Sequence, residues 1–390
     1  MNHFTLSLAA GAIAGALVVI PMIFQRFSAR SCIASFLIYL FAGVIIFYGN
    51  LPYLRGLLGK LALTEEDTLV FCGDMVEKGP QSLATLRYIM DLAKKRRVLA
   101  VQGNCDCWQD EIYRATPRSD IYTKKYLLAN SAGWGPGLLA QMSAEIGFEV
   151  REDTDMAEFR RRIGEAFAPE LDFLDSLPHV IDAGRYVFVH GGLPEGGRED
   201  WDGWKCMKND NFLGQGRSFD RWVIVGHWPV TLYGTDTVCA NPIIERERKI
   251  ISIDGGCVLK DDGQLNALII PYNGSEDFQV EHYDPFPVRR VKSAQKGSEK
   301  SIYIRWGDNI VRILERGREF SRCVHVRTGY ELDILTKNLY GESGEVRCND
   351  CTDYVLPLEP GDEVAVVETT SRGYFVKHKG VSGWYGGELL

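Results

Sequence analysis

Residues 67–79 read DTLVFCGDMVEKG, and this stretch decides the fold. Its first half is a short apolar run rich in β-formers, which predicts a buried β-strand. Its second half places the carboxylate of Asp74 directly after a glycine, and glycine allows the backbone to turn sharply. A strand that ends in a glycine and a metal-binding type of side chain indicates a site at the carboxyl edge of an α/β sheet.

The same pattern of an apolar run, a polar side chain and a neighbouring glycine recurs further along the chain. The polar residues that follow these later runs are Asn104, His190 and His227. Together with Asp74 they offer a carboxylate, an amide oxygen and two imidazoles, which suit Mn²⁺, Fe or Zn²⁺ better than Ca²⁺. The sequence therefore predicts that these four side chains bind one divalent metal.

In this order the motifs resemble those of calcineurin-like metallophosphoesterases, close to the phosphoprotein phosphatase branch and to diadenosine tetraphosphate hydrolases. That family pattern runs D-x-H-G-N, G-D-x-x-D-R-G, G-N-H-[ED], H-[AG]-G and G-H-[TW]-P. The last four motifs stand here at residues 73–79, 103–106, 190–192 and 226–229. The resemblance covers residues 44–285 and implies a four-layer αββα sandwich. It also implies hydrolysis of a phosphorylated substrate, either a phosphoprotein or a nucleotide, by a metal-activated water.

The first family motif is the one that this chain lacks. By the resemblance, Asp74 bridges two metals and the other three ligands complete one of the two sites. The second site needs the Asp and His of D-x-H. Aligning residues 49–50 with the family's G-N places Ile46 and Tyr48 at those two positions. Neither side chain is a useful ligand there, so we expect one complete metal site and one doubtful site.

Four further residues carry the chemistry that the resemblance implies. The family's general acid, the His of G-N-H, is Cys105 here, and its acidic partner is Asp106. Two interpretations of Cys105 stay open: a proton donor supported by Asp106, or an inert loop thiol. Lys78 replaces the phosphate-binding arginine, keeping the charge without the bidentate fork. Lys208, in the segment after the H-[AG]-G motif, is a candidate for a second phosphate contact.

The amino-terminal residues are strongly apolar. Residues 4–24 carry no charge and are long enough to cross a bilayer, and residues 31–47 form a second uncharged run. We therefore expect a hydrophobic segment at 1–43 that anchors the protein in a membrane. Arg26 and Arg30 flank the first run and would keep the catalytic part cytoplasmic. The alternative is that residues 1–47 are a misread gene start, in which case the protein is cytoplasmic.

Composition narrows the class of protein. The chain has 390 residues and a net charge of −8, which argues against general nucleic-acid binding. Its 10 cysteines are scattered, as in a reduced cytosolic protein. Between residues 111 and 180 the spacing of apolar side chains predicts helices.

Past the catalytic region, residues 286–302 are basic, polar and Pro-bearing, which predicts a linker. Residues 303–390 then read as short strands, and their end resembles a bacterial SH3-like barrel. Trp384 and Tyr385 either line a groove for a peptide ligand or belong to the barrel core.

A second, smaller metal site is also considered. Four potential ligands with one C-x₂-C spacing lie in the carboxyl-terminal region: Cys323, His325, Cys348 and Cys351. They have the residue types of a structural zinc site. The alternative is that they are ordinary cysteines of β-hairpins.

Two functions follow from these expectations. The first is a metal-dependent phosphoesterase, impaired to the extent that Ile46 and Tyr48 remove a metal site. The second is a catalytically inactive, membrane-tethered scaffold that acts through the SH3-like domain.

Overall fold

The computed structural model describes residues 50–129, 135–341 and 345–390. These residues divide into two compact units. Of the described residues, unit 1 contains 50–58 and those between Leu63 and Leu177, and unit 2 contains Gly59–Ala62 and those between Pro178 and Leu390. The predicted hydrophobic segment at 1–43 lies outside the described residues, and so do Ile46 and Tyr48. In the ranges that are described, no helix is long and apolar enough to span a bilayer.

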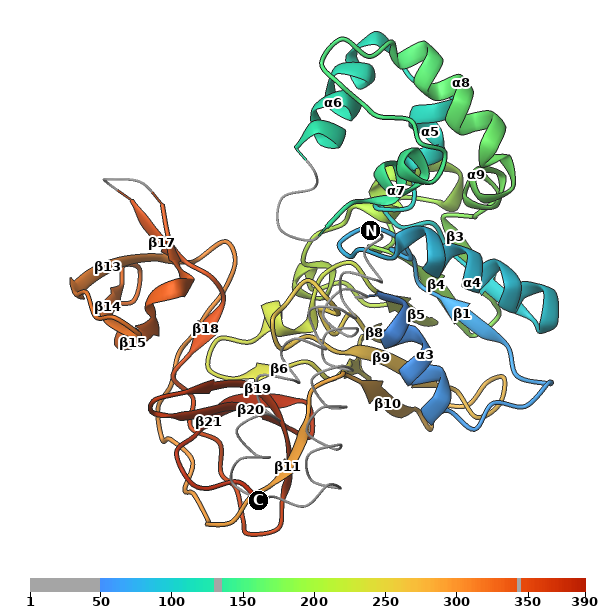
Figure 1. Cartoon of the computed structure of the whole chain (residues 1–390). Helices are drawn as coiled ribbons and strands as arrows, with labels where there is room; N and C mark the ends of the chain where they lie inside the picture. The colour runs from blue at the N-terminus through green and yellow to red at the C-terminus, as the bar shows by residue number, and fades with distance from the viewer. Residues whose placement is uncertain (1–49, 130–134, 342–344) are drawn as a thin grey trace, which may run out of the picture. The chain divides into compact units, whose positions relative to one another are not determined.

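Unit 1 begins with a parallel strand–helix–strand arrangement (Figure 1). After α3 (Asn50–Lys60), strand β1 (Leu69–Phe71) pairs in parallel with β2 (Val98–Ala100), and α4 (Ser82–Lys95) connects them. The two strands lie where the apolar runs before Asp74 and Asn104 predict them, so both predictions are confirmed. Because the strands are parallel, both following loops leave the same edge of the pair.

The rest of unit 1 is helical, as the apolar spacing predicts. The helices are α5 (Trp108–Tyr113), α6 (Pro117–Leu128), α7 (Leu138–Glu145), α8 (Met156–Ala166) and α9 (Ala168–Asp175). Helices α5, α8 and α9 pack on one another. Phe159 and Ile163 supply the buried face of α8 at the spacing of one helical turn. Asp155 begins this helix by accepting a hydrogen bond from Ala157 N at 2.9 Å, which satisfies one of the unpaired amides of the first turn.

Unit 2 contains a five-stranded mixed sheet in the order β3-β4-β5-β8-β7. Its strands are β3 (Val180–Ala183), β4 (Tyr186–Val189), β5 (Trp222–Val225), β7 (Ile243–Glu245) and β8 (Ile250–Ser252). The central strands β4, β5 and β8 run parallel, and β4 and β5 are buried along their whole length. Continuous apolar strands of this kind are typical of a sheet covered on both faces. The strands predicted before His190 and His227 are therefore confirmed.

Shorter elements complete this half of unit 2. They are the hairpin β9 (Leu265–Ile269) and β10 (Gln279–Tyr283), helix α10 (Gly203–Met207), and the 3₁₀ turns η1 (Arg198–Asp200), η2 (Phe212–Gln215) and η3 (Val230–Tyr233). The chain thus combines helices and sheets, as the α/β prediction requires. The four-layer stacking stays a prediction.

The carboxyl-terminal region is β-rich but differs from the expected barrel. One sheet has the order β11-β19-β20-β21-β6 and a second has the order β15-β14-β13-β17-β16. Neither sheet closes on itself within the described residues, so the small barrel predicted for 303–390 is not found. The first sheet takes in β6 (Val238–Cys239) from the segment before residue 285, and this pairing explains why the strands do not form a separate closed body.

The strands of this region have the following bounds: β11 (Val288–Arg290), β12 (Tyr303–Ile304), β13 (Ile310–Glu315), β14 (Phe320–His325), β15 (Glu331–Leu335), β16 (Leu339–Tyr340), β17 (Val346–Cys348), β18 (Cys351–Thr352), β19 (Glu363–Thr370), β20 (Gly373–His378) and β21 (Val381–Tyr385), with the 3₁₀ turn η4 (Thr336–Asn338). Residues 286–302, expected as a linker, contain β11, which pairs with β19. The domain limits at 285 and 302 stay a prediction.

The two aromatic residues near the end of the chain belong to the packed interior. Tyr385 is 1% exposed, lies in an apolar cluster and donates from its hydroxyl to Ser293 O at 2.9 Å. Trp384 packs against Phe320 and Phe375 and donates from Nε1 to Thr352 O at 2.7 Å. Of the two alternatives, these contacts favour the core position over an open peptide groove.

Candidate metal centre

In unit 1, Asp74 lies in the loop that follows β1. Its φ is 54° and that of the preceding Gly73 is 84°, so two consecutive residues adopt the left-handed conformation. This conformation is uncommon for a residue with a Cβ atom and costs on the order of 1–3 kcal/mol. The Asp74 carboxylate accepts a hydrogen bond from Cys105 N at 2.9 Å through Oδ1. The loop after β1 is therefore held by the loop after β2.

Gly103 makes this close approach possible. A Cβ atom added at Gly103 would collide with the backbone N and with Oδ1 of Asp74. The obstacle includes backbone atoms, which cannot swing aside as the end of a side chain can. The glycine that precedes Asn104 is thus required by the spacing of the two loops.

Asp106 is completely buried between the same two loops. Its Oδ1 accepts from Met75 N at 2.8 Å and from Val76 N at 3.3 Å, and its Oδ2 accepts from Gly103 N at 2.9 Å. Hydrogen bonds from backbone amides to a carboxylate are charge-assisted and strong. The structure thus places Asp106 as the residue that joins the loops bearing Asp74 and Asn104.

Cys105 lies beside these residues with a protonated thiol. Burial first, and then the negative charge of Asp74, raises the pKa of this thiol well above its usual value. Asn104 Nδ2 donates to its Sγ at 3.5 Å. A thiol with so high a pKa is a poor proton donor at neutral pH. Its role as general acid stays a prediction.

The neighbouring Glu77 points toward the helices of unit 1. Its carboxylate accepts from Leu138 N, the first residue of α7, at 2.6 Å and from the Tyr126 hydroxyl. Burial raises the pKa of Glu77, while these hydrogen bonds act in the opposite direction. Lys78, the predicted phosphate-binding residue, follows with a φ of 51°. Its role in substrate binding also stays a prediction.

Unit 2 contributes the two imidazoles. His190 directly follows β4, and His227 lies two residues after β5 in a left-handed conformation with a φ of 63°. The parallel pairing of β4 with β5 brings the two rings to a centroid separation of 5.2 Å. Gly191 N donates to Cys206 O at 2.7 Å, so the His190 loop is attached to the end of α10.

A carboxylate that the sequence did not single out holds His227. Asp210 Oδ1 lies 2.7 Å from His227 Nε2, and Lys208 Nζ donates to the same oxygen at 3.1 Å. Burial raises the pKa of Asp210, but the hydrogen bonds from His227 and Lys208 outweigh it and hold that pKa below its usual value. A carboxylate on one ring nitrogen fixes the orientation of a metal-binding histidine. Lys208 Nζ is also 3.3 Å from His227 Nε2, so this phosphate-contact candidate lies beside a predicted ligand.

Unit 1 thus offers the carboxylate of Asp74, and unit 2 the imidazoles of His190 and His227, as candidate metal ligands. A carboxylate and two imidazoles are compatible with Mn²⁺, Fe and Zn²⁺. Asn104 adds an amide oxygen next to Cys105 in the loop after β2. The donor set therefore fits a divalent transition metal without selecting one.

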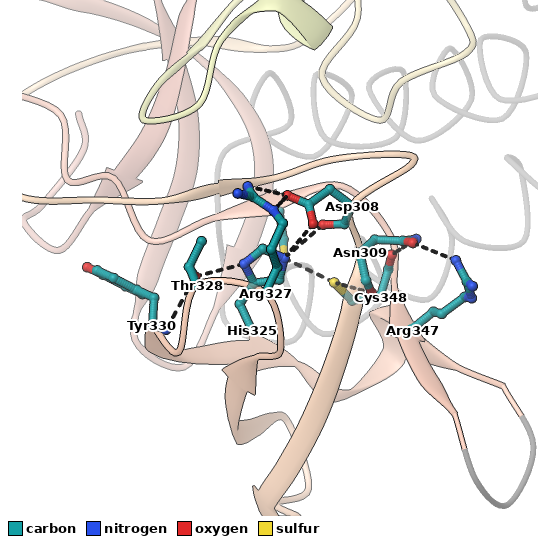
Figure 2. Close-up of polar contacts among 9 residues, drawn as sticks. Asp308, Asn309, His325, Arg327, Thr328, Tyr330, Arg347 and Cys348 are labelled. Atoms are coloured by element: carbon teal, nitrogen blue, oxygen red, sulfur yellow. Dashed lines mark hydrogen bonds and ion pairs between the residues drawn. The ribbon is translucent and has the colours of Figure 1, made fainter.

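The zinc site at Cys323, His325, Cys348 and Cys351 stays a prediction, and the contacts of His325 do not favour it. His325 Nδ1 is hydrogen-bonded to Thr328 Oγ1 at 2.9 Å and Nε2 to Asp308 O at 2.9 Å (Figure 2), so both ring nitrogens are occupied by the protein. The described residues contain no metal-binding group at this position. Cys323 and Cys348 pack in an apolar cluster instead.

Comparison with known proteins supports the motif assignments. The model of the calcineurin-like phosphoesterase family matches residues 46–251, just over half of the chain and including all four predicted ligands. Bis(5'-nucleosyl)-tetraphosphatase PrpE (asymmetrical) of Bacillus velezensis is 25% identical over 243 residues, which cover 59% of this chain and 84% of that protein. The protein of the same description from Halalkalibacterium halodurans is 26% identical over 222 residues, covering 52% of this chain and 75% of its own.

Proposed function

Because this chain belongs to the calcineurin-like phosphoesterase family, we propose that it hydrolyses a phosphomonoester or a phosphoanhydride with a divalent metal. The observation that carries the proposal is the set of candidate ligands that each unit presents after its parallel strands: Asp74 and Asn104 in unit 1, and His190 and His227 in unit 2. When bound, such an ion polarises a phosphate oxygen and lowers the pKa of a coordinated water.

The residues of the chain itself position the reactants. Asp106 joins the two loops that bear Asp74 and Asn104, and Asp210 orients His227. Holding groups in a reactive arrangement before substrate arrives removes a large entropic part of the barrier. Lys78 and Lys208 supply positive charge for the phosphate as point charges rather than as bidentate forks.

For the substrate we propose a nucleotide phosphoanhydride as the first class to test. The support is the similarity to the two proteins described as bis(5'-nucleosyl)-tetraphosphatases. A phosphoprotein is the second class, because the motifs also resemble those of phosphoprotein phosphatases. Release of a mononucleotide from diadenosine tetraphosphate, compared with release of phosphate from a phosphopeptide, separates the two classes.

We further propose that the activity is reduced because Ile46 and Tyr48 replace the family's Asp and His. One metal polarises a phosphate less effectively than two metals, which clamp the attacking and the leaving oxygens together. The test compares manganese-dependent phosphate release by the natural chain with that of an Ile46→Asp/Tyr48→His variant. We expect the variant to be more active. Equal activity in both would show that the second metal site is not needed.

The second candidate function is an inactive scaffold, tethered to a membrane by residues 1–43. The observation that favours it is the absence of a carboxylate or an imidazole at positions 46 and 48. If both proteins are folded but neither releases phosphate or nucleotide with manganese, the scaffold replaces the hydrolase. Partition of the full chain with membranes after cell fractionation tests the tether, and a soluble full chain would support a cytoplasmic protein instead.

A further inference from the structure

Unit 2 contains a polar cavity that is lined by none of the predicted metal ligands. Its volume is about 430 Å³, within the range of about 300–1,000 Å³ that is typical of small-molecule sites. Three segments line it: residues 235–236 after η3, residues 301–305 around β12, and residues 327–330 in the turn between β14 and β15. The cavity thus lies between strands of the carboxyl-terminal region and the segment that follows the His227 loop.

Most polar groups of the wall already bond within the protein. The Tyr303 hydroxyl donates to Asp350 at 2.9 Å, and the Tyr330 hydroxyl donates to Asp353 at 2.8 Å. Ser301 Oγ donates to the backbone O of Asp236 at 2.7 Å. These hydroxyls therefore shape the wall and have little remaining capacity to select a ligand.

Arg327 is held in place but keeps a donor for a ligand. Its Nε donates to Asp308 Oδ2 at 2.7 Å, and its Nη2 lies 2.5 Å from the same oxygen (Figure 2). Asp308 in turn is hydrogen-bonded to the buried His325 through its backbone O. Among the described residues Nη1 of Arg327 has no hydrogen-bond partner, so the guanidinium is oriented in advance and partly unsatisfied.

Arg305 is less satisfied. Its Nε donates to Leu232 O in η3 at 2.8 Å. In the part of the chain that the structure describes, its guanidinium makes no ion pair with a carboxylate, and both Nη atoms lack a hydrogen-bond partner. The one carboxylate in the cavity wall is that of Asp236, an exposed residue. Asp308 balances the charge of Arg327, so Arg305 is the charged group of the wall that no carboxylate pairs within the described residues.

We propose that this cavity binds a small phosphorylated metabolite through Arg305 and Arg327. Guanidinium groups form short, charge-assisted hydrogen bonds with phosphate oxygens, and two of them can grip a tetrahedral group from different sides. The volume exceeds what a phosphate ion fills, and the side chains of Ile302 and Tyr330 offer apolar surface for the organic part. Because Arg305 also holds Leu232 in η3, shortly after His227, a bound metabolite is connected to the loop of a predicted metal ligand.

Isothermal titration of the full chain tests the proposal, with ribose 5-phosphate, adenosine 5'-monophosphate and succinate as probes. A metal chelator in the buffer keeps hydrolysis and metal-bound phosphate from contributing, so failure of the hydrolase proposal would not affect this result. We expect saturable binding of at least one phosphate ester, and weaker binding of succinate. The Arg305→Gln and Arg327→Gln variants should bind about tenfold to a hundredfold more weakly.

The matched control is Arg318→Gln. Arg318 is an exposed arginine between β13 and β14 that is remote in sequence from the cavity segments and makes no ion pair among the described residues. This variant should bind as tightly as the natural chain. If Arg305→Gln fails to fold, Arg305→Lys, which keeps the charge but loses the fork, should still bind measurably more weakly. No saturable binding of either phosphate ester, tighter binding of succinate, or equal affinity in the two cavity variants and the control would overturn the proposal.

Discussion

Asp106 in unit 1 and Asp210 in unit 2 are carboxylates beside predicted metal ligands, but their surroundings differ. Asp106 is fully buried and accepts hydrogen bonds from the backbone of Met75, Val76 and Gly103. Asp210 keeps 47% of its side chain exposed and bonds to the side chains of His227 and Lys208. A buried carboxylate that joins backbone segments supports the fold of its loops. An exposed one on a histidine ring supports the orientation of a ligand.

Of the changes that test the difference between Asp106 and Asp210, we expect the largest effect from Asp106→Asn, which should lower the stability of the protein. In this variant one of the two carboxylate oxygens becomes an NH₂ group, which cannot accept a hydrogen bond. It would face a backbone N–H group of Met75 or Gly103 that then has no acceptor. Buried hydrogen bonds to charged groups contribute about 1.5–3 kcal/mol each, so the free energy of unfolding should fall by about 3 kcal/mol. Urea denaturation measures this free energy of unfolding. Asp210→Asn is the matched control and should lower it by under about 1 kcal/mol, as is usual for exposed ion pairs. Equal losses in the two variants would remove the distinction.

Asp210→Asn should instead weaken metal binding. Loss of the carboxylate partner of a ligating histidine typically costs about 10–100-fold in metal affinity. Isothermal titration calorimetry with manganese, applied to the natural chain and to the folded variant, measures the change in metal affinity. Asp182→Asn is the matched control for this measurement. Asp182 forms an exposed ion pair with Arg221 and contacts no predicted metal ligand. Unchanged manganese affinity in Asp210→Asn would show that the contact with His227 has no role in metal binding.

The smallest expected effect concerns a third carboxylate, Glu77, and the pH dependence of stability. Burial raises the pKa of Glu77 in the folded protein above its usual value near 4.5. The folded state therefore holds its proton more tightly than the unfolded state. The stabilising contribution is present below pH 4.5 and is lost as pH rises through the folded pKa.

Glu77→Gln should remove this dependence. Unfolding free energies from urea titrations of metal-free protein at several pH values between about 4 and 7 compare the two proteins. The natural chain should lose stability relative to the variant as pH rises through the raised pKa of Glu77. A difference between the two proteins that stays constant over this range would contradict the assignment.

Much of the fold and the identity of the candidate ligands could be predicted from local sequence patterns. Strands β1, β2, β4 and β5 are short apolar runs with a glycine within the next three residues, so each pattern is complete within a few residues. The predicted ligands follow these strands because loops at the carboxyl edge of parallel strands collect polar side chains. The helices between residues 108 and 175 were equally predictable from the spacing of buried positions such as Phe159 and Ile163.

Other features could not be predicted because they depend on partners that are distant in sequence. The roles of Asp106 and Asp210 depend on whether each carboxylate meets a backbone amide or an imidazole. The hydrogen bonds that Thr328 and Asp308 make with both ring nitrogens of His325, an expected zinc ligand, are a second example. The expected barrel is replaced by open sheets because β21 pairs with β6.

The sequence by itself determined the family, the strand positions and the identity of the candidate ligands, since these follow from periodicity, from glycine and from the order of motifs. Only the tertiary structure decided which acid joins loops, which acid orients His227, and that Arg305 and Arg327 line one cavity. The physical reason is that hydrogen bonds and charge pairing are short-ranged. A side chain's role is therefore set by the groups that folding brings within about 3 Å of it.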